Sequence, residues 1–146
     1  MNNKINIRKI ELEDYEYINK WWVEQGFDAL HTDILPMDGL GGIIIEKEKP
    51  IAVAYLYLTN SKMGYVDNLI ADPNYKSKDR FDIILKLMMA CIEMAKKVGC
   101  LEVWAMAESR GILQRCKTLG YSVSEKKHSI ISVTWWINKN KNEKTK

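Results

Sequence analysis

The segment from Asn68 to Arg80, NLIADPNYKSKDR, combines a strand end, a loop and the start of a helix. Such a joint points backbone N–H groups outward, and the helix dipole adds positive potential, which together favour phosphate. Lys76, Lys78 and Arg80 add three cations in this loop, and Ser77 is a plausible N-cap. The segment therefore predicts an anion-binding site, with an ordinary basic turn capped by serine as the alternative.

Other chemistries have little support. Cys91, Cys100 and Cys116 include no Cys-x-x-Cys pair and are odd in number. They indicate reduced thiols of a cytoplasmic protein, with neither a disulfide framework nor a zinc site. No cluster of histidine, cysteine or acidic residues has metal-ligand spacing, and no nucleophile-elbow pattern surrounds a serine. The absence of a long apolar run and of a signal-peptide pattern argues against a membrane span or secretion.

The positive charge of the chain is confined to its end. Residues 139–146 contain four lysines and one glutamate, which account for the whole net charge of +3 of the 146 residues. We expect this basic tail to be disordered and residues 1–138 to form a single domain. Because the domain is neutral without the tail, it offers no electrostatic case for nucleic-acid binding.

Periodicity in the sequence predicts an α/β domain. The 47% of apolar residues is typical of a globular protein. Hydrophobic spacing predicts helices at about 13–25, 80–98 and 110–119, the first two ended by Gly26 and Gly99 and the third by Gly120. Residues 27–40 are expected to be a loop with one helical turn. Strands are expected at 5–10, 42–45, 51–58, 65–71, 101–107 and 129–137, with a short one near Tyr121.

Two hairpins come first and crossover helices follow, so the sheet should be mixed, antiparallel early and parallel around the long helix. This order, with Asp72-Pro73 at a strand end and Gly120-Tyr121 after a helix, resembles the GNAT superfamily of acetyl-CoA-dependent N-acetyltransferases. The segments LIADPNYKSKDRFDIILKL and ESRGILQRCKTLGY carry the likeness, and YLYLTNS with a degenerate loop makes the phage and prophage variety look nearest. The resemblance implies a mostly antiparallel sheet of six to seven strands with about four helices.

The resemblance also implies a site for acetyl-CoA as co-substrate. In the family the backbone of the strand before the loop binds the pantetheine arm, and the matching positions are Leu69, Ile70 and Ala71. An Asn that opens the following helix in many members corresponds to Ser109.

The family loop carries a basic residue and glycines whose amides approach the pyrophosphate. The basic position falls on Lys76, and the glycine positions fall on Ser77, Asp79 and Phe81, so all three glycines are missing. Lys78 and Arg80 lie between these positions. The Asp79 carboxylate would repel a diphosphate unless it points away and pairs with Lys76 or caps the helix.

The catalytic candidates follow from the same likeness. Asp67, expected on one strand face with Tyr65 and Leu69, matches the family's general base, with a solvent-facing or cross-sheet role as the alternative. Glu108 is a second candidate base or a first-turn helix acid. The family's proton-donating tyrosine is replaced by Cys116, which is either a thiol donor or a small apolar residue on the inner helix face.

The resemblance leaves the acceptor amine open. The family binds it at the first helix, at the loop here spanning 27–40 and at the last hairpin. An exposed Trp21 would suit a flat acceptor, and the surplus of tryptophans is consistent with a homodimer contact, whereas core packing is the ordinary role. Because the loop lacks glycine and the helix lacks tyrosine, a non-catalytic module acting through a protein partner is the competing hypothesis.

Overall fold

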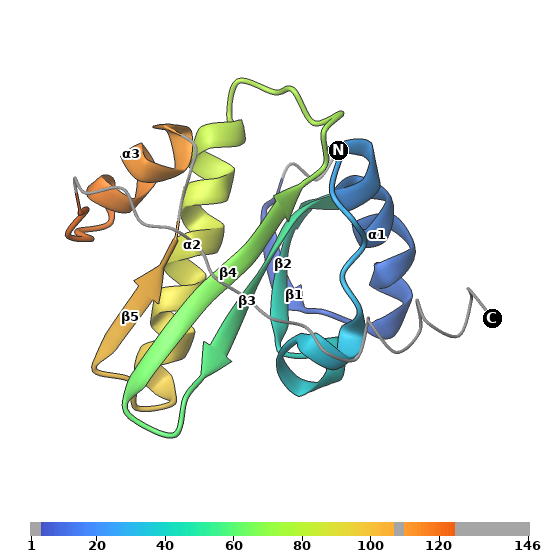
Figure 1. Ribbon diagram of the computed structural model, residues 1–146. Coiled ribbons are helices and arrows are strands. Elements are labelled where there is room, and N and C mark those ends of the chain that lie inside the picture. Colours follow the sequence, from blue (N-terminus) through green and yellow to red (C-terminus); the bar gives the residue numbers. More distant parts are fainter. Residues whose placement is uncertain (1–3, 107–109, 125–146) are drawn as a thin grey trace.

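The computed structural model describes residues 4–106 and 110–124 of the chain. Within them, five strands form one sheet in the order β1-β2-β3-β4-β5 (Figure 1). Neighbours are antiparallel from β1 to β4, and β4 and β5 are parallel. The strands are β1 (Asn6–Lys9), β2 (Gly42–Lys47), β3 (Lys49–Leu58), β4 (Met63–Ala71) and β5 (Glu102–Ala105).

Among the described residues, three α-helices cover the sheet on its two faces: α1 (Tyr15–Glu24), α2 (Arg80–Lys97) and α3 (Arg110–Thr118). Helix α2 makes the crossover between the parallel strands β4 and β5 and packs on one face beside α3, whereas α1 packs on the other face (Figure 1). The predicted mixed sheet and the long crossover helix are therefore confirmed.

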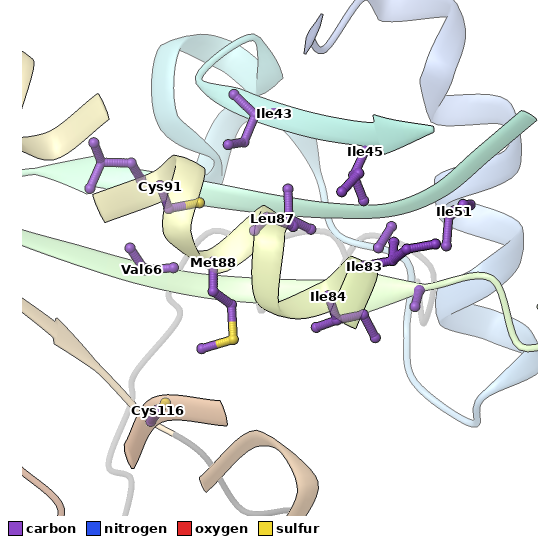
Figure 2. Packing of buried hydrophobic residues seen from close by; sticks show 14 of the residues in the cluster. Ile43, Ile45, Ile51, Val66, Ile83, Ile84, Leu87, Met88, Cys91 and Cys116 are labelled. Atoms are coloured by element: carbon purple, nitrogen blue, oxygen red, sulfur yellow. The ribbon is translucent and has the colours of Figure 1, made fainter. Parts of the chain in front are cut away.

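The α2 face holds the larger core. Ile83, Leu87 and Cys91 recur at three- to four-residue spacing and are fully buried against side chains of β2, β3 and β4 (Figure 2). A fully buried aliphatic side chain contributes about 1.5–3 kcal/mol, so this stripe makes a large contribution to the packing of α2 on the sheet. Cys116 brings α3 into the same cluster.

The α1 face combines apolar packing with buried hydroxyls. Ile18 and Trp21 are buried against this face, so Trp21 has the core role and not that of an exposed acceptor platform. The hydroxyls of Tyr15 and Tyr55 are 2.8 Å apart, and that of Tyr15 donates to the Gly39 carbonyl at 2.7 Å. These hydrogen bonds give the buried hydroxyls partners in place of water, and they attach the loop before β2 to the sheet.

A buried carboxylate fixes the start of α1 to the edge strand. The Arg8 guanidinium donates two hydrogen bonds of 2.8 Å to Asp14, which also accepts from Tyr17 and, at 2.7 Å, from the Glu11 N–H. Burial raises the pKa of Asp14, but these hydrogen bonds outweigh it and leave the pKa below its usual value. The short β1 is thus tied to the helix as well as to β2.

Two features of the predicted fold need correction within the described residues. Instead of six to seven strands and about four helices, the structure has five strands and three α-helices. Residues 121–124 form no strand, and the expected strand at 129–137 and the basic tail lie outside the described residues. The loop at 27–40 holds two 3-10 turns, Thr32–Ile34 and Pro36–Gly39, because Pro36 and the left-handed Met37 and Asp38 prevent an α-helix.

The helix ends expected at Gly99 and Gly120 are confirmed, with φ of +92° and +87°. In the described part of the chain, no helix combines the length and apolar character needed to cross a membrane.

The Arg8–Asp14 pair generates a stability prediction. We expect Arg8→Met to lower the free energy of unfolding at pH 7 by about 2 kcal/mol, because it leaves a buried carboxylate without its cation. The value lies below that for a fully buried pair since the Arg8 side chain is 29% exposed. The pKa of Asp14 is lowered in the folded state, so the effect is complete above about pH 5 and shrinks as pH falls.

Urea unfolding at several pH values measures this effect. Lys20→Met is the matched control, because Lys20 makes only an exposed contact of 3.7 Å with Glu24. Equal losses in the two variants would contradict a special role for the Arg8–Asp14 pair.

Candidate functional site

A β-bulge in β4 sets the geometry of the site. Tyr55 of β3 faces Asp67 and Val53 faces Ile70, so Ala54 alone opposes both Asn68 and Leu69. Asn68 has a φ of +53°, a conformation that asparagine tolerates better than most residues. The extra residue reverses the alternation of side chains beyond it.

The bulge corrects the expected placement of Asp67 and Leu69 on one face. Asp67 lies with Tyr65 on the α1 face, and the Tyr65 hydroxyl donates to its carboxylate at 2.9 Å. Leu69 packs on the α2 face instead, and Ile70 returns to the α1 face.

Strand β4 continues beyond its parallel partner. Pairing with β5 covers only Met63 to Val66, opposite Glu102 to Ala105, and β4 runs on to Ala71. Figure 1 shows β4 diverging from the end of β5 and leading towards the start of α2. Along the described residues, Leu69, Ile70 and Ala71 have no strand partner on the β5 side, so their backbone edge is open to a ligand.

The loop after β4 is held from within. The Arg80 guanidinium donates to the carbonyls of Asp72 at 2.9 Å and Tyr75 at 2.7 Å, which braces the loop against the first turn of α2. The side chains of Lys76, Ser77 and Lys78 are exposed on its outer side. Helix α2 begins at Arg80 with Asp79 as its N-cap, so the cap expected at Ser77 is wrong.

Asp79 is turned towards groups that neutralise it. Its carboxylate accepts hydrogen bonds from Lys47 Nζ at 3.1 Å and from the Tyr75 hydroxyl at 2.8 Å. Hydrogen bonds from Ser77 and Tyr75, followed by the contact with Lys47, lower the pKa of Asp79 to about 2. The carboxylate makes no helix-capping bond, and its cation comes from the β2–β3 hairpin and not from Lys76.

A further cation lies beside the start of α2. The Arg115 guanidinium of α3 stacks over the Phe81 ring at 4.4 Å and donates to the Phe81 carbonyl at 3.3 Å. Burial and then the nearby charge of Arg80 lower the pKa of Arg115. In the part of the chain that the structure describes, no carboxylate pairs with Arg115. Two neighbouring guanidinium groups without such a partner favour an anion.

The remaining catalytic candidates are separated by the sheet. Cys116 is 4% exposed in the core on the α2 face, and burial raises the pKa of its thiol. Asp67 lies on the opposite face. Glu108 and Ser109 lie outside the described residues.

Sequence reasoning missed Lys47 and Arg115. Arg115 stands in the segment ESRGILQRCKTLGY, directly before Cys116, which was expected on the inner face of its helix. This position next to the inner face was a usable signal that the Arg115 side chain lies near the neighbouring helix. Lys47 carried no comparable signal, because only the folded sheet brings the hairpin to Asp79.

Outside the β4–α2 junction, the structure bears on two other kinds of site. Among the described residues, no group of three or more histidine, cysteine or acidic side chains is placed to hold a metal ion. A cleft of about 770 Å³ runs along β5, lined by the end of α2, by β5 itself and by residues 119–122 and 124. No residue from Asp67 to Phe81 lines it, so this cleft is separate from the β4–α2 junction.

Comparison with known proteins relates this geometry to acetyltransferases. No family model and no curated protein matches the sequence. Solved structures do match: an acetyltransferase of Trypanosoma brucei has a TM-score of 0.65 at 15% identity, over 88% of this chain and 100% of that one. Glucosamine-6-phosphate N-acetyltransferase of Arabidopsis thaliana has a TM-score of 0.64 at 15% identity, over 88% and 98%.

A predicted acetyltransferase of Clostridium acetobutylicum, solved with acetyl-CoA, has a TM-score of 0.59 at 16% identity, over 88% of this chain and 96% of that one. At such identities a likeness establishes the fold and leaves the reaction to the residues of the site. The chain therefore has the fold of the GNAT acetyltransferases.

Proposed function

We propose that this protein is an N-acetyltransferase that moves an acetyl group from acetyl-CoA directly to a primary amine. The observation that carries the proposal is the continuity between the open edge of β4 and the cationic loop that starts α2. The strand edge provides backbone hydrogen bonds for an extended amide-containing chain, and the loop provides positive charge for phosphates at the end of that chain. The acetyltransferase fold of the neighbours supports the same reading.

The residues present fit acetyl-CoA although the loop has no glycine. Leu69, Ile70 and Ala71 would hold the pantetheine arm through their backbone, while Lys76, Ser77 and Lys78 would face the pyrophosphate. The expected repulsion from Asp79 is reduced because Lys47 and Tyr75 hold its carboxylate. Arg80 braces the loop, and Arg115 with its stacked Phe81 adds positive charge nearby, which suits the phosphates at the adenosine end.

Acetyl-CoA supplies a thioester carbonyl carbon that an uncharged amine can attack. Asp67 would take the proton from the incoming ammonium through water, and the N–H groups of Ile70 or Ala71 would polarise the carbonyl. A C–N bond forms, the C–S bond breaks, and the departing thiolate takes up a proton. Glu108 remains an alternative base.

The thiol of Cys116 is the candidate donor for the leaving thiolate. Its raised pKa keeps it protonated at neutral pH, and it lies in the core on the α2 face of the sheet. Its burial equally suits a purely packing role. An unchanged kcat in Cys116→Ala would remove this residue from the mechanism.

We also propose a cytoplasmic location, kinship with phage-type members and a homodimer contact, and we expect no nucleic-acid or membrane partner. These proposals come from the sequence patterns alone. They do not depend on the proposed reaction, and a test of the reaction does not test them.

The cofactor loop gives the first prediction of this function. We expect calorimetric titration with acetyl-CoA to give micromolar affinity, and Lys76→Glu/Lys78→Glu to weaken it about tenfold or more, because charge-assisted contacts to phosphate are reversed. Lys62→Glu/Lys97→Glu makes the same charge change at exposed positions elsewhere and should bind normally. Desulfo-CoA tests whether the diphosphate portion suffices.

The absence of heat and of any change in melting temperature at millimolar acetyl-CoA would refute the enzyme proposal. A non-catalytic module that acts through a protein partner would then be the better account.

Lys47 provides a second prediction. Lys47→Ala frees the Asp79 carboxylate beside the loop, so we expect acetyl-CoA affinity to fall about threefold to tenfold at low salt. Adding Asp79→Asn to this variant should restore the affinity. Lys49→Ala removes the same charge from the same hairpin without an ion pair and serves as control. A double variant as weak as Lys47→Ala alone would contradict the role given to Asp79.

The proposed base gives a third prediction. With thiol release measured over a panel of primary amines, Asp67→Asn should lower kcat about 100-fold and leave acetyl-CoA binding intact, because it removes the proton acceptor. Glu93→Gln, which removes an exposed carboxylate of α2, should change neither. Unchanged kcat in Asp67→Asn would transfer the role to Glu108.

A further inference from the structure

Two tyrosine rings and a carboxylate lie together on the α1 face beside the proposed reaction centre. Tyr57 of β3 is the cross-strand neighbour of Tyr65 of β4, and their ring centroids are 6.0 Å apart with planes tilted by 53°. The Tyr65 hydroxyl donates to Asp67 Oδ2 at 2.9 Å. All three side chains are half-buried, in contrast to the fully buried Tyr55 on the same face.

The hydrogen bonds fix these rings in place. Tyr65 is oriented by Asp67, and the Tyr57 hydroxyl accepts from Asn68 Nδ2. Burial and then the nearby Asp67 carboxylate raise the pKa of Tyr65, and burial also raises that of Tyr57, so both phenols stay neutral. The set therefore presents one negative charge flanked by two rigid, electron-rich rings.

The carboxylate retains capacity for a ligand. Within the described residues, Asp67 accepts a hydrogen bond only from Tyr65 and has no cationic partner. A half-buried carboxylate without a counter-ion attracts a cation more strongly than one in open water. Ring faces within reach of the same cation add cation–π attraction and pack against methylene groups.

The loop at residues 27–40 is negatively charged, as is the Asp67 carboxylate. Residues 27–40 contain Asp28, Asp33 and Asp38 and no lysine or arginine. Their second 3-10 turn packs on β3, and the Tyr15 hydroxyl links Gly39 to Tyr55, the cross-strand partner of Asp67. The α1 side of the junction is therefore acidic, whereas the start of α2 is basic.

We propose that Tyr57, Tyr65 and Asp67 bind the ammonium end of an unbranched alkylamine, which makes cationic alkylamines the acceptor class. The inference rests on the proposed function for its catalytic meaning. The rings suit a methylene chain, and each phenolic hydroxyl already makes one hydrogen bond, which leaves fewer groups to recognise the hydroxyls of an amino sugar. A free diamine and a lysine side chain share this chemistry.

Binding is measured without acetyl-CoA, so that the result is independent of the cofactor loop. The probes are 1,4-diaminobutane and Nα-acetyl-lysine amide, with glucosamine as the amino sugar and 1,4-butanediol as the uncharged chain. Ring resonances of Tyr57 and Tyr65 are followed by NMR during each titration. We expect saturable shifts with at least one of the two alkylamines, at least tenfold weaker binding of glucosamine, and none with the diol.

Variants assign the site. Asp67→Asn and Tyr57→Leu should each weaken alkylamine binding about tenfold, and Tyr65→Phe, which keeps the ring, should lose less than Tyr65→Leu. Glu93→Gln is the matched charge control, and melting curves verify the fold of every variant. Which alkylamine binds more tightly distinguishes a small-molecule from a protein acceptor.

Equal binding of glucosamine and diamine, undiminished binding in folded Asp67→Asn, or no saturable shift with either alkylamine would each overturn the proposal. Alkylamine binding in a protein that fails to bind acetyl-CoA would instead overturn the enzyme function and leave this cation site standing.

Discussion

The left-handed conformation of Asn68 is the constraint on which the site depends. One extra residue in β4 places Asp67 on the α1 face and Leu69 on the α2 face, where regular alternation would have put them together. In the described part of the chain, pairing with β5 ends at Val66, just before this bulge, and the strand edge on that side is open from there on. With regular alternation from Asp67 onwards, Leu69 would lie on the α1 face together with the carboxylate.

In the proposed cofactor site, charge pairing would stand in for the glycines that the loop at the start of α2 lacks. Glycines would let backbone amides approach an anion closely, and this chain has Ser77, Asp79 and Phe81 instead. The unfavourable carboxylate is engaged by Lys47 and Tyr75, and Phe81 supports the guanidinium of a neighbouring helix. With the cofactor bound as proposed, longer-range attraction would replace close backbone contact, and such attraction is more sensitive to salt.

Local patterns in the sequence predicted most of the fold. The apolar stripe of α2 gave its bounds almost to the residue, since three- to four-residue spacing over so long a run has no competing interpretation. The bulge was missed because a single asparagine in a strand does not reveal its φ angle. The pairing of Lys47 with Asp79 was missed because it joins residues 32 positions apart, a relation that only the folded sheet creates. Contacts of this kind decide the electrostatics of the site, which explains why the fold was easier to predict than the site.

The two faces of the sheet differ in charge in a way that suits a reaction between oppositely charged partners. Basic side chains gather where β4 leads into α2, and acidic ones lie on the α1 side around Asp67 and the loop at 27–40. A polyanionic donor and a cationic acceptor would therefore be drawn to different sides of one strand. Among the described residues, β4 has no partner on the β5 side from Asp67 to Ala71, so those two sides meet at the backbone of Leu69 and Ile70. In the proposed reaction, charge separation across β4 would thus select both partners, and the bulge would bring them to the same few peptide groups.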